Sequence, residues 1–136
     1  MSDARWVEVE EDIADAVHHF SMAAAMHGED TAIRSGSGDL ASYKDGMALM
    51  HSMQCAHTSF ENAMKRILEM LGEQAPSGES WHKDLVMRVS KSLKDRPAIL
   101  DERLKDAAEE TRSFRNIASV YCKTKDSILS RGVILS

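Results

Sequence analysis

The sequence is poor in the residues that build covalently cross-linked folds: only Cys55 and Cys122 among its 136 residues are cysteine. Two cysteines are too few for a disulfide framework, and in a reducing compartment they usually pack as small core residues. Proline also occurs only twice, at Pro76 and Pro97. We therefore interpret both cysteines as free thiols and look for chain breaks near the two prolines.

Long apolar runs are also missing. No run approaches the length that crosses a bilayer, and the first twelve residues are acidic rather than basic and apolar, which argues against a signal peptide. With 43% hydrophobic and 29% charged residues, the composition is that of an ordinary globular protein. We expect a cytoplasmic protein with no membrane partner and a single domain over residues 1–136.

Charge is unevenly distributed. Acidic side chains dominate the first thirty residues, and basic ones dominate the last twenty-five, where they are Arg112, Arg115, Lys123, Lys125 and Arg131. The net charge of -5 does not favour non-specific binding to nucleic acid, although a basic end could receive a phosphate. The alternative interpretation is two solvated faces of opposite sign.

Apolar residues recur every three or four positions, and no segment alternates like a strand. The first pattern predicts a helix over residues 4–27 with a single apolar face and an acidic outer face. The apolar face comprises Trp6, Val9, Ile13, Val17, Phe20 and Ala24. Residues 28–39, which include Ser35-Gly36-Ser37-Gly38, read as a flexible loop ending at a candidate N-cap, Asp39. Residues 40–71 carry two apolar stripes, so this helix is expected to be central and buried on two sides.

Two further helices follow. Gly72, Pro76 and Gly78 break the chain, a shorter helix then begins at Trp81, and Arg96-Pro97 is expected to end it. The last helix is predicted to begin near Asp101, with a narrow stripe that suits packing against another helix, either of this chain or of a second one. This stripe comprises Leu104, Ala107, Thr111, Phe114, Ala118 and Tyr121. The predicted fold is all-α, an antiparallel bundle of four long helices with a short C-terminal segment.

Four blocks of residues, in this order and at this spacing, resemble the HepT-like branch of the HEPN superfamily. The resemblance is clearest over residues 40–122, and the block that contains Trp81-His82 is the most specific. The blocks are Ser59-Phe60-Glu61-Asn62-Ala63-Met64-Lys65-Arg66-Ile67, Gly78-Glu79-Ser80-Trp81-His82-Lys83-Asp84-Leu85, Arg96-Pro97-Ala98-Ile99-Leu100-Asp101-Glu102-Arg103-Leu104 and Thr111-Arg112-Ser113-Phe114-Arg115-Asn116.

The resemblance implies a helical homodimer that is the toxin partner of a small MNT-type nucleotidyltransferase antitoxin. Active members of the family are metal-independent ribonucleases, and their motif is Arg, four variable residues, His, one residue and Tyr on the helix that also forms the dimer interface. In this sequence the motif positions fall on Arg115, Val120 and Cys122. Two of the three motif residues therefore differ.

No shift of the motif restores the histidine. Moving it back by one residue recovers Tyr121 but puts Ser119 in place of the histidine, and no histidine follows His82. Metal-free cleavage of RNA needs a group that titrates near neutrality to take the proton of the 2′-hydroxyl, while the arginine holds the phosphate. Losing that group alone costs about a hundred- to ten-thousand-fold in rate.

Three functions follow as alternatives. The first is a catalytically degenerate dimeric binding module of a toxin-antitoxin-type system, in which Arg115 and Asn116 still bind a phosphate of RNA. The second is an active endoribonuclease toxin that uses Arg115 with a substitute for the missing histidine. The third is a protein-interaction scaffold with no nucleic-acid role. Arg115 could instead form an ion pair with Glu109 or Glu110, as exposed arginines commonly do.

The other candidate residues give weaker indications. His51 and Cys55 are four positions apart on one predicted helix, but two metal ligands without a third do not make a site, so no metal or cofactor is expected. His82 is expected to pack or to cap a helix. Tyr121 is a possible site for nucleotide transfer by the antitoxin. After Cys122, only residues 127–133 could form a further helical turn or two, which is shorter than the family pattern.

Overall fold

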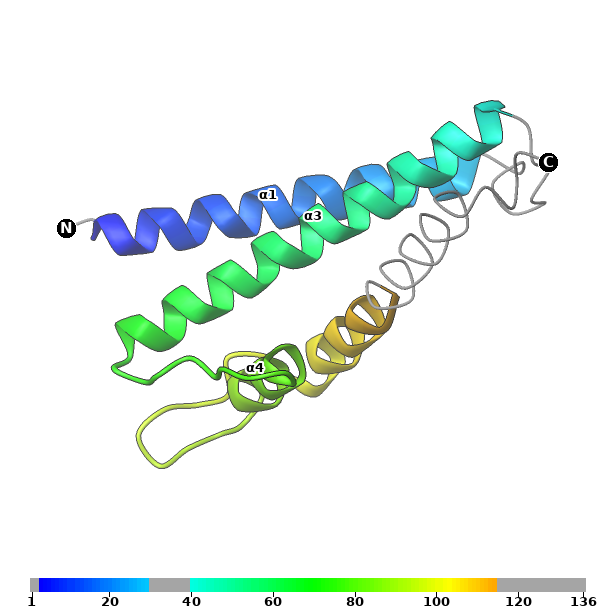
Figure 1. Cartoon of the computed structure of the whole chain (residues 1–136). Coiled ribbons are helices and arrows are strands. Elements are labelled where there is room, and N and C mark those ends of the chain that lie inside the picture. Colours follow the sequence, from blue (N-terminus) through cyan, green and yellow to red (C-terminus); the bar gives the residue numbers. More distant parts are fainter. Residues whose placement is uncertain (1–2, 30–39, 115–136) are drawn as a thin grey trace.

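The structure, a computed structural model, describes residues 3–29 and 40–114, and these residues form helices joined by short connections. Helix α1 (Ala4–Glu29) lies beside the longer α3 (Leu40–Met70), and α4 (Trp81–Val89) and a helix over residues 102–114 lie on the other side of α3 (Figure 1). The described residues contain no strand, only an isolated bridge between Leu93 and Arg96. The predicted all-α class and helical bundle are confirmed.

The first helix begins at Ala4, as predicted, and runs slightly beyond its expected end. The carboxylate of Asp3 accepts the backbone N–H of Arg5 at 2.9 Å, as an N-cap residue does. Helix α1 continues to Glu29, two residues past the predicted boundary at residue 27. Most of the predicted loop over 28–39 lies outside the described residues.

Helix α1 buries a line of residues that shares only Val9 with the predicted apolar face. Val9, Ala16 and Ala23, each seven residues apart, are buried. Trp6, Ile13 and Val17 of the predicted apolar face remain 48%, 41% and 59% exposed. A helix that packs against one neighbour is covered only along one line of contact. The apolar face of α1 next to that line therefore remains exposed.

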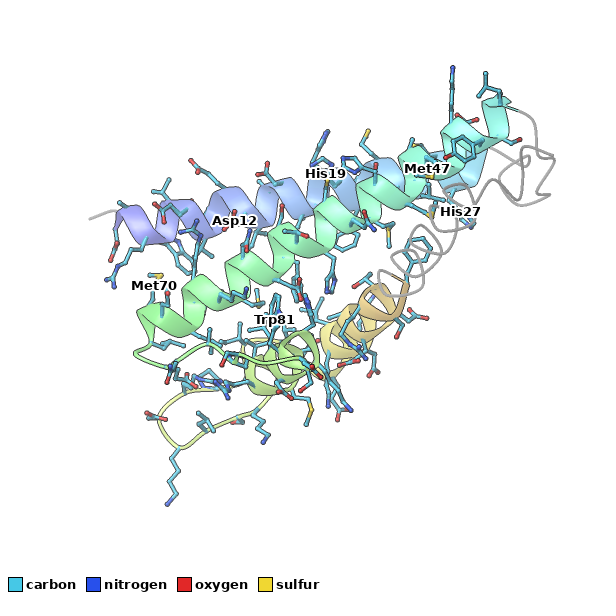
Figure 2. All side chains as sticks on the ribbon, in the orientation of Figure 1. Asp12, His19, His27, Met47, Met70 and Trp81 are labelled. Carbon is cyan, nitrogen blue, oxygen red and sulfur yellow. The ribbon has the colours of Figure 1, made fainter. Side chains whose placement is uncertain are left out.

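Two acidic residues of α1 also form ion pairs with an arginine of α3. Nε of Arg66 donates to Oδ2 of Asp12 at 2.8 Å, and its Nη1 donates to Glu8. Asp12 faces α3 in Figure 2. The acidic outer face predicted for α1 is thus partly engaged with a cation of the central helix.

Helix α3 is central, as predicted. Buried Ala63, Met64 and Leu68 belong to one core with residues of α4 and of the chain that follows it. The remaining buried members of that core are Val9, Leu85, Val86, Val89, Leu100 and Ala108. Helix α3 ends in a Schellman motif: the N–H of Glu73 donates to Leu68 O at 2.9 Å and that of Gly72 to Glu69 O at 3.0 Å, with Gly72 at φ +75°.

The predicted end of the third helix is wrong. Helix α4 ends at Val89, well before Arg96-Pro97. The carbonyl of Val89 instead accepts the N–H groups of Ile99 and Leu100 at 2.8 and 3.1 Å, so the returning chain satisfies the helix end. Arg96-Pro97 therefore belongs to the loop that makes this return.

The last described helix begins as predicted. Oδ1 of Asp101 accepts the N–H of Leu104 at 2.8 Å, which caps a helix over residues 102–114. Ala108 faces the core, whereas Leu104 is 52% exposed. The predicted stripe positions Ala118 and Tyr121 lie outside the described residues. No helix among the described residues has the length and apolar character needed to cross a membrane.

Candidate functional site

The motif residues themselves lie outside the described part of the chain: Arg115, Asn116, Ser119, Val120, Tyr121 and Cys122. The described structure ends one residue before Arg115, with the helix over residues 102–114 that leads to it in the sequence. We call this helix the motif helix. The structure therefore shows how the motif helix is attached to the other helices.

Four side chains from α3, α4 and the motif helix lie close together. We call them the buried network: His57, Glu61, His82 and Thr111. Nδ1 of His57 lies 3.2 Å from Oγ1 of Thr111. Nε2 of His57 lies 3.4 Å from Oε2 of Glu61, and the same oxygen forms a hydrogen bond with Nδ1 of His82. His57 is fully buried and Glu61 is 2% exposed. The network thus joins α3, α4 and the motif helix.

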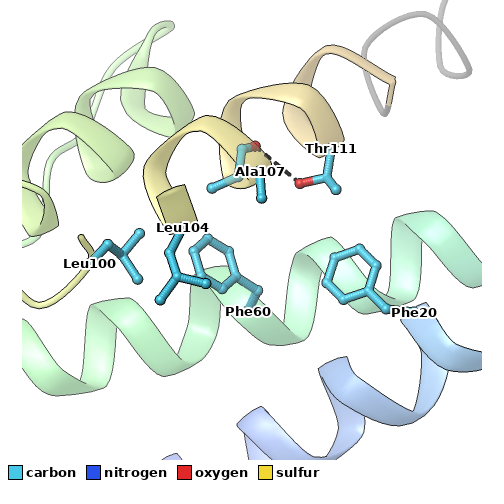
Figure 3. Close-up of a pocket in the computed structure, with 7 residues that line it drawn as sticks. Phe20, Phe60, Leu100, Leu104, Ala107 and Thr111 are labelled. Carbon is cyan, nitrogen blue, oxygen red and sulfur yellow. Dashed lines mark hydrogen bonds between the residues drawn. The ribbon is translucent and has the colours of Figure 1, made fainter. Parts of the chain in front are cut away.

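Thr111 links the network to its own helix. Its hydroxyl donates to the carbonyl of Ala108 at 3.0 Å (Figure 3) and also lies within hydrogen-bond distance of Nδ1 of His57. Which of these two partners donates in the contact between His57 and Thr111 depends on the tautomer of the ring. The second ring nitrogen, Nε2, is buried and has no hydrogen-bond partner among the described residues, although the Glu61 carboxylate faces it.

The environment keeps Glu61 ionised. Burial acts to raise the pKa of its carboxyl group, but the hydrogen-bonding and charge interactions with His57 and His82 outweigh burial and lower that pKa below its ordinary value. A buried carboxylate between two imidazoles is an arrangement that can hold and share protons.

His82 is the most accessible imidazole of the network. Its side chain is 23% exposed, and its ring lies against that of Trp81 with the centroids 3.6 Å apart. The ammonium of Lys65 on α3 sits 3.7 Å from the centroid of Trp81, which lies between α3 and α4 in Figure 2. The packing role expected for His82 is present, and the carboxylate partner Glu61 is an addition that the sequence analysis missed.

The other sequence candidates that fall within residues 3–29 and 40–114 are not assembled into a catalytic or metal site. Sγ of Cys55 lies 3.5 Å from Nε2 of His51, but no group of three potential metal ligands occurs among the described residues. Glu109, a predicted partner for Arg115, accepts from Arg112 at 2.9 Å. Arg115 lies outside the described residues, so its alternative ion pair with Glu109 or Glu110 stays a prediction.

An apolar cavity of about 290 Å³ opens beside the buried network, between α1, α3 and the motif helix (Figure 3). Its walls come from Phe20, Phe60, Leu100, Leu104, Ala107, Ala108 and Thr111. Phe20 lies on α1 three residues beyond the exposed Val17, so the cavity continues the open apolar face of that helix. Together they form one apolar surface on the described part of the chain.

Residues 48–129 match the protein family described as HepT-like protein. The chain belongs to the HepT-like family. Membership places it in the HEPN superfamily, implies the toxin role of a toxin-antitoxin pair, and implies an MNT-type antitoxin as its partner. No curated protein and no solved structure matches the chain. The buried network lies within the matched HepT-like segment, whereas α1 precedes it.

Proposed function

We propose that this HepT-like chain is a dimeric binding module of a toxin-antitoxin-type pair, with a nuclease motif that holds a phosphate of RNA but lacks its base. Arg115 and Asn116 are the residues proposed to hold that phosphate, because an arginine and a neighbouring amide can donate several hydrogen bonds to its oxygens. Val120 or Ser119 stands where the family motif has histidine, and neither supplies the lost proton transfer.

One observation carries the proposal. The imidazole that contacts the motif helix, His57, is fully buried, and its Nδ1 is committed to Thr111. A general base must reach the proton that it abstracts, within hydrogen-bond distance or through one water molecule. We therefore interpret His57, buried beneath the motif helix, as a structural residue and not as a substitute for the missing catalytic histidine.

The apolar surface supports the dimeric part of the proposal. Trp6, Ile13 and Val17 are partly exposed on α1, and Leu104 is exposed on the motif helix beside the cavity. Contiguous exposed apolar patches on soluble proteins commonly mark interaction sites. We propose that a second copy of the chain covers this surface, and that the MNT-type antitoxin binds the resulting dimer and has Tyr121 as its acceptor for nucleotide transfer.

The decisive experiment incubates the purified chain with labelled single-stranded RNA and measures binding and cleavage in the same samples. The proposal expects salt-sensitive binding without cleavage, and weaker binding by Arg115→Ala. The matched control is Arg103→Ala, which removes an exposed arginine from the motif helix and should leave binding near the wild-type value. Cleavage that disappears in Arg115→Ala would overturn the proposal.

Two other outcomes have clear meanings. Binding that survives in Arg115→Ala but fails when Lys123 and Lys125 are changed would assign RNA to the basic tail instead of the motif. Absence of binding under all salt conditions would favour a protein-interaction scaffold. Mass spectrometry after coexpression with a nucleotidyltransferase partner tests the modification, and an unmodified Tyr121 counts against that part.

The second candidate is an active endoribonuclease, and a specific observation favours His82 as its base. Its Nδ1 is oriented by a buried carboxylate, and its side chain is 23% exposed, which is how an imidazole is prepared to act through Nε2. Cleavage of RNA by the wild type that is lost in His82→Ala, with binding retained, would favour this candidate over the binding module.

A further inference from the structure

We infer that Trp6 of one copy of the chain enters the apolar cavity of a second copy, with the two α1 helices antiparallel and Ile13 on the twofold axis. The inference rests on the proposed dimer and names the side chain and the cavity that hold it together. Helix α1 precedes the HepT-like segment of residues 48–129, so this contact belongs to a part of the chain that the family match does not include.

Trp6, Ile13 and Phe20 lie along one line of α1. They are seven residues apart, and seven residues turn an α-helix through about 700°, only about 20° short of two full turns. The buried line that begins at Val9 has the same spacing. A seven-residue apolar repeat is the pattern with which two long helices pack side by side at a small crossing angle. Trp6 and Ile13 are partly exposed, so the outer line of α1 is suited to a second long helix.

The cavity lies at the Phe20 end of this line. Phe20 and Phe60 form its walls on α1 and α3 (Figure 3). On the motif helix its walls are Leu104, Ala107 and Thr111. Its volume is about 290 Å³, whereas an apolar cavity of about 150 Å³ is enough to hold benzene. The cavity is therefore large enough to accept an indole side chain.

The same face of α1 carries both the exposed indole and the cavity. Trp6 lies seven residues before Ile13, and Phe20 of the cavity wall lies seven residues after it. In a contact about a twofold axis, if residue i of one copy meets residue j of the other, then j also meets i. Two antiparallel α1 helices that cross at Ile13 therefore bring each Trp6 to Phe20 of the other copy.

This symmetry favours a second copy over a partner of another sequence. An unrelated partner would have to supply a large apolar side chain for the cavity and also a surface that covers Trp6. A second copy supplies both, and it makes the contact twice. Tryptophan in a desolvated pocket is typical of the residues that carry most of the binding energy of an interface. We therefore expect dimerisation to depend strongly on Trp6.

Ile13→Cys tests the axis by cross-linking. Residues that face each other where two helices cross about 8–10 Å apart have Cα atoms roughly 5 Å apart, which a disulfide can span. Val17 lies four residues beyond the axis in each copy, so its two copies are separated by about 12 Å of helix rise, which is too far. In a chain that carries Cys55→Ser and Cys122→Ser, oxidised Ile13→Cys should form a covalent dimer. Val17→Cys in the same chain should not, although Val17 is the more exposed of the two.

Trp6→Ala tests the occupant of the cavity. It should weaken dimerisation by about tenfold or more in sedimentation equilibrium. Val7→Ala is the matched control, because Val7 is exposed to a similar extent but lies about 100° further around the helix. Ala107→Phe places a ring in the cavity from the motif helix itself, and it should also weaken dimerisation although Trp6 is unchanged.

The results separate this inference from the proposed dimer. A chain that dimerises equally well with Trp6→Ala and with Val7→Ala, or that cross-links through Val17→Cys rather than Ile13→Cys, would overturn the inference and leave the dimer in place. A wild-type chain that stays monomeric at every concentration would overturn both. If circular dichroism shows that Trp6→Ala loses helical content, the cross-linking comparison still decides.

Discussion

The guanidinium of Arg96 meets both carboxylate oxygens of Glu73, with Nε 2.6 Å from Oε2 and Nη2 3.0 Å from Oε1. Arg96 is 9% exposed and also donates to the carbonyls of Lys91, Arg88 and Pro97. Such a bidentate contact has the geometry that only an arginine fork provides. It ties the loop after α4 to the residue that closes the end of α3.

The Arg96 contact predicts a pH dependence of stability. Hydrogen bonding to Arg96 lowers the pKa of Glu73, so its contribution is present above the ordinary value of 4.5 and is lost as pH falls through the folded value. Glu73→Gln should lower the urea midpoint at neutral pH and reduce the further loss in acid. Glu79→Gln, an exposed acid in the same connection, is the control, and equal curves for the two variants would contradict the prediction.

Thr111→Val should destabilise the fold although it preserves the side-chain shape. It removes the hydrogen-bond partner of Nδ1 of His57, and an unpaired polar group in a buried site costs about 1–3 kcal/mol. Thr111→Ser keeps the hydroxyl and should recover most of that loss. Urea unfolding followed by circular dichroism measures both variants, and equal losses for Val and Ser would show that the hydroxyl is unimportant.

Two leucines should respond differently to truncation. Leu68 is fully buried in the core, so Leu68→Ala should lower the free energy of unfolding by about 2–5 kcal/mol. Leu104 is 52% exposed, and Leu104→Ala should change it by about 0.5 kcal/mol or less in dilute monomer. Thermal and urea unfolding at low protein concentration compares them. Similar losses would place Leu104 in the monomer core.

Helix positions that depend on local chemistry could be predicted from the sequence. The helix that starts at Leu40 ends at Met70 because Gly72 adopts the left-handed conformation of a Schellman motif, and Asp101 caps the last described helix. The end of α4 could not be predicted in this way. Its last carbonyl is satisfied by Ile99 and Leu100, which lie about ten residues further along the chain.

The buried network shows the same limit. His57 and Glu61 are four positions apart on one helix, which the sequence displays, and this spacing alone could have indicated their contact. Thr111 is 54 residues from His57, and His82 is 21 residues from Glu61, so only the packing of three helices brings them together. Likewise, periodicity identified the large apolar residues of α1, but not that the line of Val9, Ala16 and Ala23 would be the buried one.

A charge placed on the apolar surface should separate the proposed dimer without unfolding the chain. Val17 is 59% exposed on this face, so Val17→Asp should weaken dimerisation by about tenfold or more, or about 1.4 kcal/mol. Met22 is 45% exposed and points well away from it around the helix, and Met22→Asp should have no such effect. Sedimentation equilibrium measures both, and equal effects would remove this surface from the interface.

The salt dependence of RNA binding separates a specific phosphate contact from general attraction. Each phosphate neutralised on a single strand contributes about -0.7 to the slope of log K against log salt. Arg115→Ala should therefore flatten the slope by about 0.7, while Arg103→Ala leaves it unchanged. A lower affinity at an unchanged slope would mean that Arg115 supports the fold or the dimer rather than a phosphate. Circular dichroism of each variant shows whether the helical content is retained, so the slope can be attributed to the arginine itself.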